Sequence, residues 1–460
     1  MASSPATDPR SVIDENPMNW RQYVVVVLMV LLNALDGFDV LSSAFAAPGI
    51  TAEWNIERAA LGIVLSAELV GMGFGSVLLG GAADKYGRKP TMVACLVLMA
   101  AGMYLASGAH AVTPMVAFRF LTGIGIGGML AATNAVTAES SNVKWRRLAI
   151  GAYVAGYPLG AIIGGIAASE WLLPAYGWRA VFEFGAAVTA VLIPVVLLLV
   201  PETAAFQATK GRLSGVNATL AAFGKPALAA LPVAASDRAK PKLTDILSNP
   251  RLRPVTLLLA FGYMFHTITF YYILKFAVQI VADYPPGYPP PVAATVLTWA
   301  NVGGFLGSVS FGFVMARLGI KWPTALMLLI GAVGVAAFGL GRDTLSGWQW
   351  ATVITGFFTN AAISGYYAAF ARGFPAYARA TGTGFVLGIG RLGAAGSPII
   401  AGALFTALGN DKLLTVSIIM AMGSVVSLVL FLLLPEHDGD TLAAHDSGDV
   451  SQLPAGTPLD

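Results

Sequence analysis

Two carboxylates three residues apart, Asp36 and Asp39, stand inside the first long apolar stretch of this 460-residue chain. An ionised carboxylate costs at least about 2.5 kcal/mol at the centre of a membrane-spanning helix, so two in one stretch require a polar cavity, a partner or a proton. Their spacing places both on one face of a helix. We predict that at least one of them binds and releases a coupling proton. The alternative is an ion pair, with Arg119 or another helix, that only holds the helices together.

The composition is that of a membrane protein. Hydrophobic residues make up 56% of the chain and charged residues 11%, against about 25% charged residues in soluble globular proteins. A single cysteine, Cys95, excludes an intrachain disulfide framework and leaves no thiol cluster for a metal. We therefore expect no metal and no cofactor, with a proton as the coupling ion. The sequence also lacks a phosphate-binding Gly-x-x-x-x-Gly-Lys-Ser/Thr run, which argues against an enzyme.

Runs long enough to cross a bilayer, about 20 apolar residues each, divide the chain into twelve predicted helices. They lie at residues 22–46, 58–82, 90–108, 112–138, 148–170, 178–200, 254–282, 292–315, 322–341, 347–371, 381–407 and 412–434. The predicted fold class is an all-α membrane protein with twelve transmembrane helices in two six-helix halves. Its parts are a polar N-terminal tail (1–21), a first bundle (22–200), a polar linker (201–253), a second bundle (254–434) and a disordered tail (435–460).

The basic residues orient these helices. Twenty of the 27 Lys and Arg residues fall on one side of the membrane if both chain ends lie on that side. Since cytoplasmic loops carry the excess of positive charge, this distribution places both termini and the linker in the cytoplasm. The formal net charge of +3 needs no nucleic acid to explain it, because basic loops facing anionic lipid are sufficient.

The two halves of the chain resemble each other. The segment Gly80–Lys89 follows the second predicted helix, and Gly312–Lys321 follows the eighth, 232 residues later. A series of glycines after Arg147 and another after Arg379 repeat at an offset of 232 or 233 residues. Duplicated six-helix units are typical of secondary transporters, whose substrate lies between the halves near the bilayer midplane.

The loop after the second predicted helix resembles the signature of the major facilitator superfamily, Gly-x-x-x-Asp-Arg/Lys-x-Gly-Arg-Arg/Lys. Six positions match it: Gly80, Asp84, Lys85, Gly87, Arg88 and Lys89. The Asp-Gly-Phe-Asp run at 36–39 and the segment 380–391 are similar to the aromatic acid:proton symporter family within it. In the second half the signature is degraded, with Ala316 at the position of the aspartate.

The resemblance implies a transporter that imports an aromatic carboxylate, of the benzoate or hydroxybenzoate class, with protons by alternating access. It also implies a multi-pass protein of the bacterial cytoplasmic membrane, which we expect to be a monomer. Two other transporters remain open: a proton symporter of a non-aromatic anion, such as a sugar acid or a dicarboxylate, and a drug/proton antiporter.

A transported anion requires cationic groups in the same cavity, and three basic residues stand within apolar segments: Arg119, Lys275 and Arg391. Arg391 lies about 15 Å into its helix, close to the midplane, among glycines that let another helix or a ligand come near. Its planar fork suits a carboxylate, so we predict it as the principal substrate anchor. For Arg119, a structural ion pair is an equally open alternative to substrate contact. For Lys275, the equally open alternative is that its ammonium group snorkels to the membrane surface.

Aromatic rings with polar tips suit a flat aromatic acid by stacking and hydrogen bonding. The candidates are Tyr153, Tyr157, His266, Tyr271 and Tyr272, with helix packing as the alternative for each. A proton relay is a further possibility for the histidine. Glu68 and Glu183 also fall within apolar segments and are secondary proton-site candidates, without a partner that the sequence identifies.

The signature loop is the predicted gate, formed by Gly80, Asp84, Gly87 and Arg88. Asp84 stands near a helix end, where it can take hydrogen bonds and charge partners from Arg88 and from a neighbouring helix. Such a latch holds the cytoplasmic side closed until the two halves rock apart. The alternative is a glycine turn with ordinary positive-inside charges, which we favour for Lys85 and Lys89.

Overall fold

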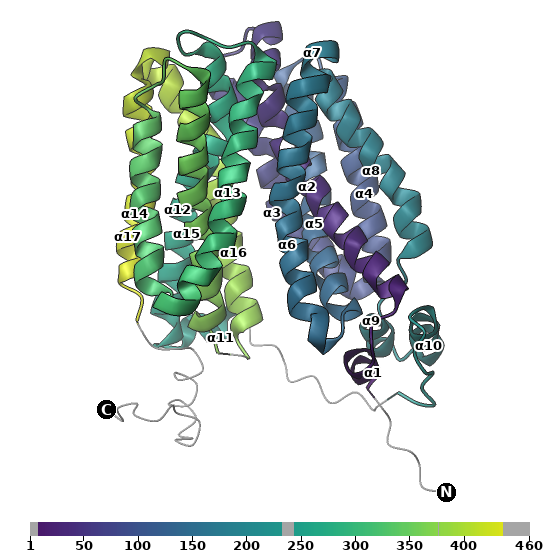
Figure 1. Cartoon of the computed structure of the whole chain (residues 1–460). Coiled ribbons are helices and arrows are strands. Elements are labelled where there is room, and N and C mark those ends of the chain that lie inside the picture. The colour runs from purple at the N-terminus through teal and green to yellow at the C-terminus, as the bar shows by residue number, and fades with distance from the viewer. Residues whose placement is uncertain (1–7, 232–242, 376, 436–460) are drawn as a thin grey trace, which may run out of the picture. The chain divides into compact units, whose positions relative to one another are not determined.

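The structure is a computed structural model that describes residues 8–231, 243–375 and 377–435, and within these ranges all of its regular secondary structure is helical (Figure 1). Its elements are α1 (Pro9–Glu15), α2 (Trp20–Trp54), α3 (Arg58–Tyr86), α4 (Arg88–Ser107), α5 (Val112–Ser140), α6 (Val143–Ala167), a π-helical turn (Ala168–Leu172), α7 (Leu173–Tyr176), α8 (Arg179–Leu199), α9 (Ala204–Thr209), α10 (Leu213–Ala222), α11 (Leu243–Ser248), α12 (Leu252–Asp283), α13 (Pro290–Leu318), α14 (Lys321–Phe338), α15 (Leu345–Gly373), α16 (Arg379–Leu408), a 3₁₀ turn (Asn410–Lys412) and α17 (Leu413–Leu432). Most of the predicted tail, residues 436–460, and part of the predicted linker, residues 232–242, lie outside the described residues.

Twelve spans in the described part of the chain match the twelve predicted runs, with α6, the π-helical turn and α7 forming one continuous span. Eleven of them have the length and hydropathy of a membrane-spanning helix. The twelfth, α15, is 29 residues long but more polar, with Gln349, Asn360 and several threonines. The predicted all-α membrane fold is confirmed.

Helix ends differ from the predicted ones because capping, rather than hydropathy, sets them. The span predicted at 22–46 is α2, which begins at Trp20, where Asn19 and Gln22 form a capping box, and runs through Pro48 to Trp54. A proline is tolerated inside a membrane helix because neighbouring groups satisfy the backbone it frees. α6 begins five residues before the predicted start, since the Asn142 side chain accepts a hydrogen bond from the N–H of Trp145.

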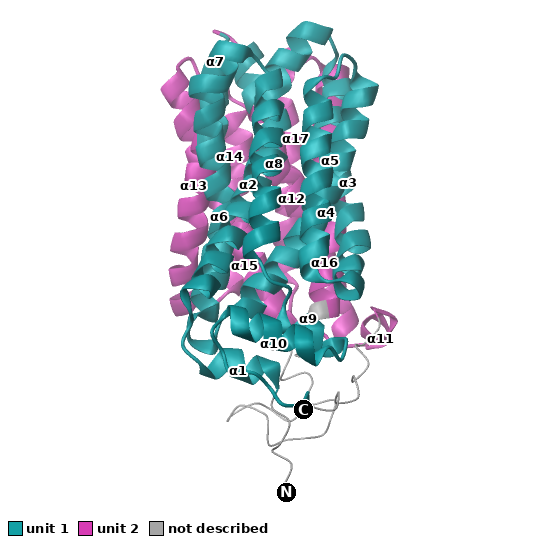
Figure 2. Cartoon of the chain, turned by 90° about the vertical axis from the view of Figure 1, so that its right-hand side faces the viewer, with its two compact units in different colours: residues 1–237, 278–283, 287–298 teal, residues 238–277, 284–286, 299–460 magenta. Residues whose placement is uncertain are grey.

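The chain divides into two compact units (Figure 2). Unit 1 comprises residues 1–237, 278–283 and 287–298, and unit 2 comprises residues 238–277, 284–286 and 299–460. The first six spans therefore belong to unit 1 and the last four to unit 2. The two spans between them, α12 and α13, lie mostly in unit 2 but have one end in unit 1.

Glycines let the backbones of α3 and α5 touch inside unit 1. A Cβ on Gly71 would overlap the carbonyl oxygen of Phe120, and a Cβ on Gly123 would overlap that of Glu68. The glycines four residues further along each helix make the same kind of contact. Small residues at this spacing allow membrane helices to approach closely, where van der Waals packing replaces the hydrophobic effect.

The same contacts recur in unit 2 at the offset found in the sequence. Gly303 of α13 stands 232 residues after Gly71 and packs against the Val353 carbonyl. Gly356 of α15 packs against the Ala300 carbonyl. In each half the second and fourth spans therefore meet backbone to backbone, as expected of two pseudo-symmetric halves.

The contact between α2 and α6 fixes the rotation of the helix that carries the two aspartates. Gly37, which stands between them, has no room for a side chain because the Tyr157 carbonyl of α6 lies against it. Gly160 of α6 packs in turn against the Ala34 carbonyl. The aspartates therefore point to the side of α2 that α6 leaves free.

The single cysteine, Cys95, is buried on α4. A Cβ on Gly128 of α5 would come within 2.7 Å of its sulfur atom, so the thiol fills the space that this glycine leaves. Packing is therefore sufficient to explain the residue.

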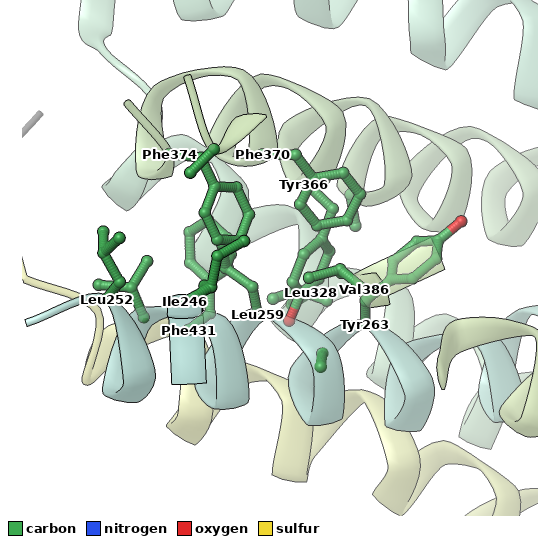
Figure 3. Packing of buried hydrophobic residues seen from close by; sticks show 14 residues of the cluster. Ile246, Leu252, Leu259, Tyr263, Leu328, Tyr366, Phe370, Phe374, Val386 and Phe431 are labelled. Atoms are coloured by element: carbon green, nitrogen blue, oxygen red, sulfur yellow. The ribbon is translucent and has the colours of Figure 1, made fainter. Parts of the chain in front are cut away.

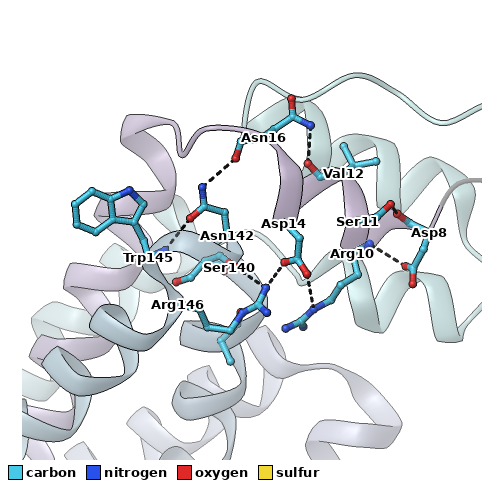
Figure 4. A network of polar contacts seen from close by, with 12 residues as sticks. Asp8, Arg10, Ser11, Val12, Asp14, Asn16, Ser140, Asn142, Trp145 and Arg146 are labelled. Atoms are coloured by element: carbon cyan, nitrogen blue, oxygen red, sulfur yellow. Dashed lines mark hydrogen bonds and ion pairs between the residues drawn. The ribbon is translucent and has the colours of Figure 1, made fainter.

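A polar network ties the N-terminal helix α1 to the turn between α5 and α6 (Figure 4). Asp14 forms an ion pair with Arg146, whose guanidinium also donates to two carbonyls at the end of α5. Asn142 Nδ2 donates to the Asn16 carbonyl over 3.1 Å. Residues 8–19 are therefore folded onto this end of unit 1.

Candidate functional site

The two aspartates of α2 lie inside unit 1. Asp36 and Asp39 are fully buried, and none of their four carboxylate oxygens has a hydrogen-bond partner among the described residues. Gly185 of α8 provides the room for Asp39, because a Cβ there would lie 3.0 Å from Asp39 Oδ1. Buried polar groups are normally hydrogen-bonded, so two such carboxylates on one helix are typical of a functional site.

Arg119 of α5 is buried beside Asp39 but makes no hydrogen bond with its carboxylate. It forms an ion pair with Glu68 of α3, which is also fully buried. Its Nη2 donates to the main-chain carbonyl of Asp39 over 2.8 Å, and its Nη1 lies 2.7 Å from Met103 Sδ. The guanidinium stands over the ring of Phe182, 5.3 Å from the centroid. The two terminal nitrogens of the guanidinium are thus held in one orientation.

The pairing of Arg119 with Glu68 differs from the ion pair with an α2 aspartate that the sequence offers as an alternative. The crossing of α3 and α5 explains it, because Gly123, one turn from Arg119, packs against the main chain of Glu68 itself. The backbone contact brings the carboxylate to the guanidinium. Glu68, for which the sequence identifies no partner, therefore lies in the same buried site as the aspartates.

We call Asp36, Asp39, Glu68 and Arg119 the acid cluster. Its three carboxyl groups and one guanidinium carry two excess negative charges when every group is ionised. Asp39 interacts electrostatically with Arg119, and Asp36 with Asp39. Excess charge is costly in a buried site unless a proton or a cation neutralises it. Proton uptake and release is the chemistry that this arrangement can perform.

The two tyrosine candidates of α6 make structural contacts in unit 1. The Tyr153 hydroxyl is buried and lies 2.9 Å from Thr133 Oγ1. Tyr157 is half-buried, and its main chain forms the contact with Gly37. A role in binding substrate stays a prediction for both.

Arg391 of α16 is half-buried in unit 2. Its guanidinium makes no hydrogen bond or ion pair within the described ranges, and its charge acts on Tyr263 of α12. The Tyr263 ring lies against Gly390, where a Cβ would overlap it. Tyr271, a candidate from the sequence, also lies within electrostatic range of the Tyr263 hydroxyl. A guanidinium without a counter-ion beside phenol rings can accept a carboxylate that is attached to an aromatic ring.

The other candidates of α12 are engaged in the packing of unit 2. His266 Nε2 lies 3.0 Å from the Thr359 carbonyl, to which it donates, and Nδ1 lies 2.9 Å from Ser424 Oγ. The Tyr272 hydroxyl bonds a serine of α17 over 2.8 Å. Lys275 is fully buried, so it does not snorkel to the surface. The contacts of His266 favour the packed imidazole over the proton relay.

The predicted gate at the turn between α3 and α4 is an ionic network. Arg88 Nη2 lies 3.2 Å from Asp84 Oδ1 and 3.5 Å from Glu139 Oε1 of α5. Asp84 is exposed, whereas Arg88 and Glu139 are largely buried. The carboxylate of Glu202 caps α4 by accepting the main-chain N–H groups of Arg88 and Lys89 over 3.1 and 3.2 Å. Negative charge is favourable at the N-terminus of a helix.

The two glycines of the predicted gate differ in how strictly the structure requires glycine at their positions. Gly87 has φ of 118°, a conformation that favours glycine, and a Cβ there would overlap the Glu202 carboxylate. At Gly80 a Cβ would meet only the Ala131 side chain, at an ordinary 3.8 Å. The turn therefore needs glycine at position 87, and no contact in the structure demands it at position 80.

The sequence analysis missed two residues of these sites, Glu202 and Tyr263, and it did not predict the contact of Glu139 with Arg88. Glu202 follows the sixth span directly, but it caps a helix more than a hundred positions earlier in the chain, so local capping signals do not reveal it. Tyr263 is one of several aromatic residues on α12, and only its position beside Arg391 distinguishes it.

A cavity of about 370 Å³ opens where α13 and α14 join in unit 2, lined by residues that include Leu259, Lys321, Arg372 and Phe431. None of the predicted site residues lines it. The described ranges also contain no group of His, Cys, Asp and Glu side chains that could hold a metal ion.

Comparison with known proteins identifies the family of the chain. The model of the Major Facilitator Superfamily matches residues 29–351. The chain is 31% identical over 397 residues to the 4-hydroxybenzoate transporter PcaK of Pseudomonas aeruginosa, covering 84% of this chain and 87% of the relative. It is 30% identical over 451 residues to the gallate transporter of Pseudomonas putida, covering 90% and 95%. Its fold matches the inward-facing, unoccupied crystal structure of a bacterial homolog to the human lysosomal transporter Spinster, with a TM-score of 0.68, 16% identity and coverage of 91% and 96%.

Proposed function

Because this chain belongs to the major facilitator superfamily and, within it, to the aromatic acid:proton symporter family, we propose that it imports an aromatic carboxylate together with protons by alternating access. It is a multi-pass membrane transporter and not an enzyme. The substrate that we propose is of the benzoate or hydroxybenzoate class, since two relatives are named for 4-hydroxybenzoate and gallate.

The buried carboxylates of Asp36 and Asp39 are the observation that carries the proposal of proton coupling. Their oxygens have no hydrogen-bond partner in the described part of the chain, and Arg119 is occupied by Glu68. A proton that binds there lowers the excess negative charge of the acid cluster, and its release restores it. In the proposed cycle Glu68 and Arg119 stay paired while the aspartates exchange protons.

Arg391 supports the proposal that the substrate is an anion. A half-buried guanidinium with phenol rings nearby offers a bidentate contact for a carboxylate and stacking surfaces for a ring. In the proposed cycle the substrate carboxylate occupies this guanidinium, and the ring lies toward the tyrosines. A cationic drug would instead meet a positive charge at this position.

The ionic network of the α3–α4 turn supports a role in gating. Arg88 joins three helices, because it contacts Asp84 of α3 and Glu139 of α5 and itself begins α4. We propose that this network, together with Glu202, keeps the ends of these helices together as a rigid group while the transporter changes conformation.

We place both termini in the cytoplasm and the protein, as a monomer, in the bacterial cytoplasmic membrane. The excess of basic residues on the loops at one end of the spans supports this orientation. Arg88 and Arg146 lie at the end of unit 1 that carries α1 and α9, which is the end proposed to face the cytoplasm (Figure 1).

Uptake by purified protein in lipid vesicles tests the proposal. With the vesicle interior alkaline, 4-hydroxybenzoate should accumulate, and the external medium should become more alkaline as protons enter with it. Asp36→Asn and Asp39→Asn keep the shape of the side chain but cannot bind a proton, so at least one should abolish accumulation driven by the gradient. Asp411→Asn is the matched control, because Asp411 is exposed and pairs with its neighbour Lys412.

Full accumulation by the Asp36→Asn, Asp39→Asn double variant would overturn the proton site. Equal uptake of benzoate derivatives and of sugar acids or dicarboxylates would replace the aromatic substrate with a general organic anion. Proton movement opposite to substrate would identify an antiporter.

A further inference from the structure

The hydroxyl of Tyr263 differs from those of the other buried tyrosines. Tyr366 bonds Ser427 over 2.6 Å, and Tyr153 and Tyr272 have partners at 2.9 and 2.8 Å. The Tyr263 hydroxyl, by contrast, has one hydrogen bond within the described ranges, to the Tyr367 hydroxyl at 3.5 Å, well beyond the roughly 2.7–2.8 Å that is usual between two hydroxyl oxygens. A buried hydroxyl with so weak a partner has capacity for a further one.

Packing holds the Tyr263 ring in place even though its hydroxyl is weakly bonded. The ring stands edge-on to Phe370 with 5.3 Å between centroids, and tilted against Tyr366 at 5.5 Å. Gly390 also packs directly against the ring, since a Cβ there would overlap it. Ring and hydroxyl are therefore fixed before any ligand arrives, which lowers the entropic cost of binding to them.

Figure 3 shows how this residue sits in the apolar cluster of unit 2. Tyr263 lies at the edge of the cluster, and its hydroxyl points away from the rings of Phe370 and Phe374. Its apolar body is thus part of the core, while its polar tip faces out of it. The tip lies within electrostatic range of Arg391, the residue that follows Gly390.

We propose that the Tyr263 hydroxyl recognises a hydroxyl group on the aromatic ring of the substrate and so makes the transporter prefer hydroxylated over unsubstituted aromatic acids. This inference rests on the proposed function. A phenol both donates and accepts a hydrogen bond, as does the ring hydroxyl of a hydroxybenzoate, so the two are complementary. With its carboxylate on Arg391, a rigid substrate holds its ring hydroxyl at a fixed distance from that anchor.

The alternative is that Tyr263 only packs. Its ring contacts would then explain the residue fully, and the hydroxyl would be dispensable. A Phe side chain keeps every ring contact and removes only the oxygen, so Tyr263→Phe separates the two roles without a cavity.

Binding of benzoate and of 4-hydroxybenzoate to purified Tyr263→Phe protein, measured by calorimetry, tests the inference. Loss of one hydrogen bond should weaken the affinity for 4-hydroxybenzoate by about three- to tenfold, with the affinity for benzoate unchanged. Tyr366→Phe is the matched control: it removes a buried hydroxyl from the same cluster, bonded to Ser427. It should lower the melting temperature but leave the ratio of the two affinities as it is.

An unchanged ratio of affinities in Tyr263→Phe would overturn the inference while leaving the proposed function in place. If neither acid binds to the wild-type protein, the proposed function fails instead, so the two failures are distinguishable. A parallel loss for both acids assigns Tyr263 to shaping the whole pocket and also overturns the selective role. Melting curves of each variant, recorded first, confirm that the proteins compared are folded.

Discussion

Glu68 and Arg119 form an ion pair between α3 and α5 in which neither side chain is exposed to solvent. The pair lies where the glycines of the two helices bring their backbones into contact, so a close helix crossing of unit 1 also carries buried charge. Burying an ion pair costs desolvation energy. Removing one partner leaves the other charge buried without compensation.

The first prediction concerns this pair. Removing one partner of a buried ion pair costs about 3–5 kcal/mol, so Arg119→Gln should strongly lower the stability of the protein. Glu68→Gln should cost less, because the Asp39 carboxylate lies within electrostatic reach of Arg119 and can replace the lost partner. Thermal unfolding in detergent, with the double variant included, gives the coupling energy between the two residues.

The control for this prediction is the surface pair of Glu53 and Arg179, whose side chains are 42% and 29% exposed, with contacts of 2.5 and 2.7 Å. Exposed ion pairs contribute about 0–1 kcal/mol, so Glu53→Gln should change the melting temperature little. Glu68→Gln and Arg119→Gln variants as stable as Glu53→Gln would contradict the importance of the buried pair.

The second prediction tests the backbone contact of α3 and α5. A Cβ on Gly75 would overlap the Ile124 carbonyl, which cannot move aside as a flexible side chain can. Gly75→Ala should therefore destabilise the protein by about 1–3 kcal/mol. Gly73→Ala, two residues earlier on the same helix, meets nothing within 4 Å and should be neutral or slightly stabilising, since alanine favours a helix more than glycine does. Equal melting temperatures of the Gly75→Ala and Gly73→Ala proteins would contradict the importance of this backbone contact for stability.

The third prediction concerns the carboxylate that caps α4. Glu202→Ala removes two hydrogen bonds to main-chain N–H groups and a negative charge at the helix N-terminus, so it should cost about 1 kcal/mol. Glu57, at the N-terminus of α3, makes no such side-chain bond. Glu57→Ala is therefore the matched control, and the two variants should differ in melting temperature.

The fourth prediction separates gating from binding. The side chain of Asp84 is 69% exposed and its contact with Arg88 is a surface one, so Asp84→Asn should leave stability nearly unchanged. If the turn is a gate, the same variant should lower the rate of transport more than substrate affinity. A loss of affinity with normal cycling would place Asp84 in the binding site instead.

The fifth prediction concerns the substrate anchor. Arg391→Lys keeps the charge but loses the planar fork, so the affinity for aromatic acids should fall, and Arg391→Ala should lower it further. Arg119 and Lys275 are the rival anchors. The corresponding variants Arg119→Lys and Lys275→Arg give the comparison. Calorimetry on folded protein measures the affinities, and an unchanged value in Arg391→Ala would exclude this anchor.

The number and order of the spans could be predicted because crossing a bilayer requires a length of apolar chain that is visible in the sequence. The position of Asp36 and Asp39 inside the first span follows in the same way. The partner of Arg119 could not be predicted, because it depends on how two helices are rotated about their axes, and glycine contacts set that rotation. Hydropathy also predicted the end of α2 at residue 46, which is too early, because the helix continues through Pro48 to Trp54.

Tyr263 and Glu202 were beyond sequence reasoning for a related reason. Each acts on a residue far away in the chain, Tyr263 beside Arg391 and Glu202 beside Arg88. Single aromatic or acidic residues are common at such positions, so only the assembled fold distinguishes these two from their neighbours.

The buried position of Cys95 makes this chain a convenient background for spectroscopic labels. It is the one cysteine among 460 residues and is shielded by packing, so thiol-reactive probes added to the folded protein should react at introduced cysteines alone. Tyr86 and Leu318 are suitable positions, because they end α3 and α13, stand 232 residues apart and are both well exposed. Spin labels at this pair would record, through pulsed electron resonance, how the distance between the two repeats changes when substrate and protons are supplied.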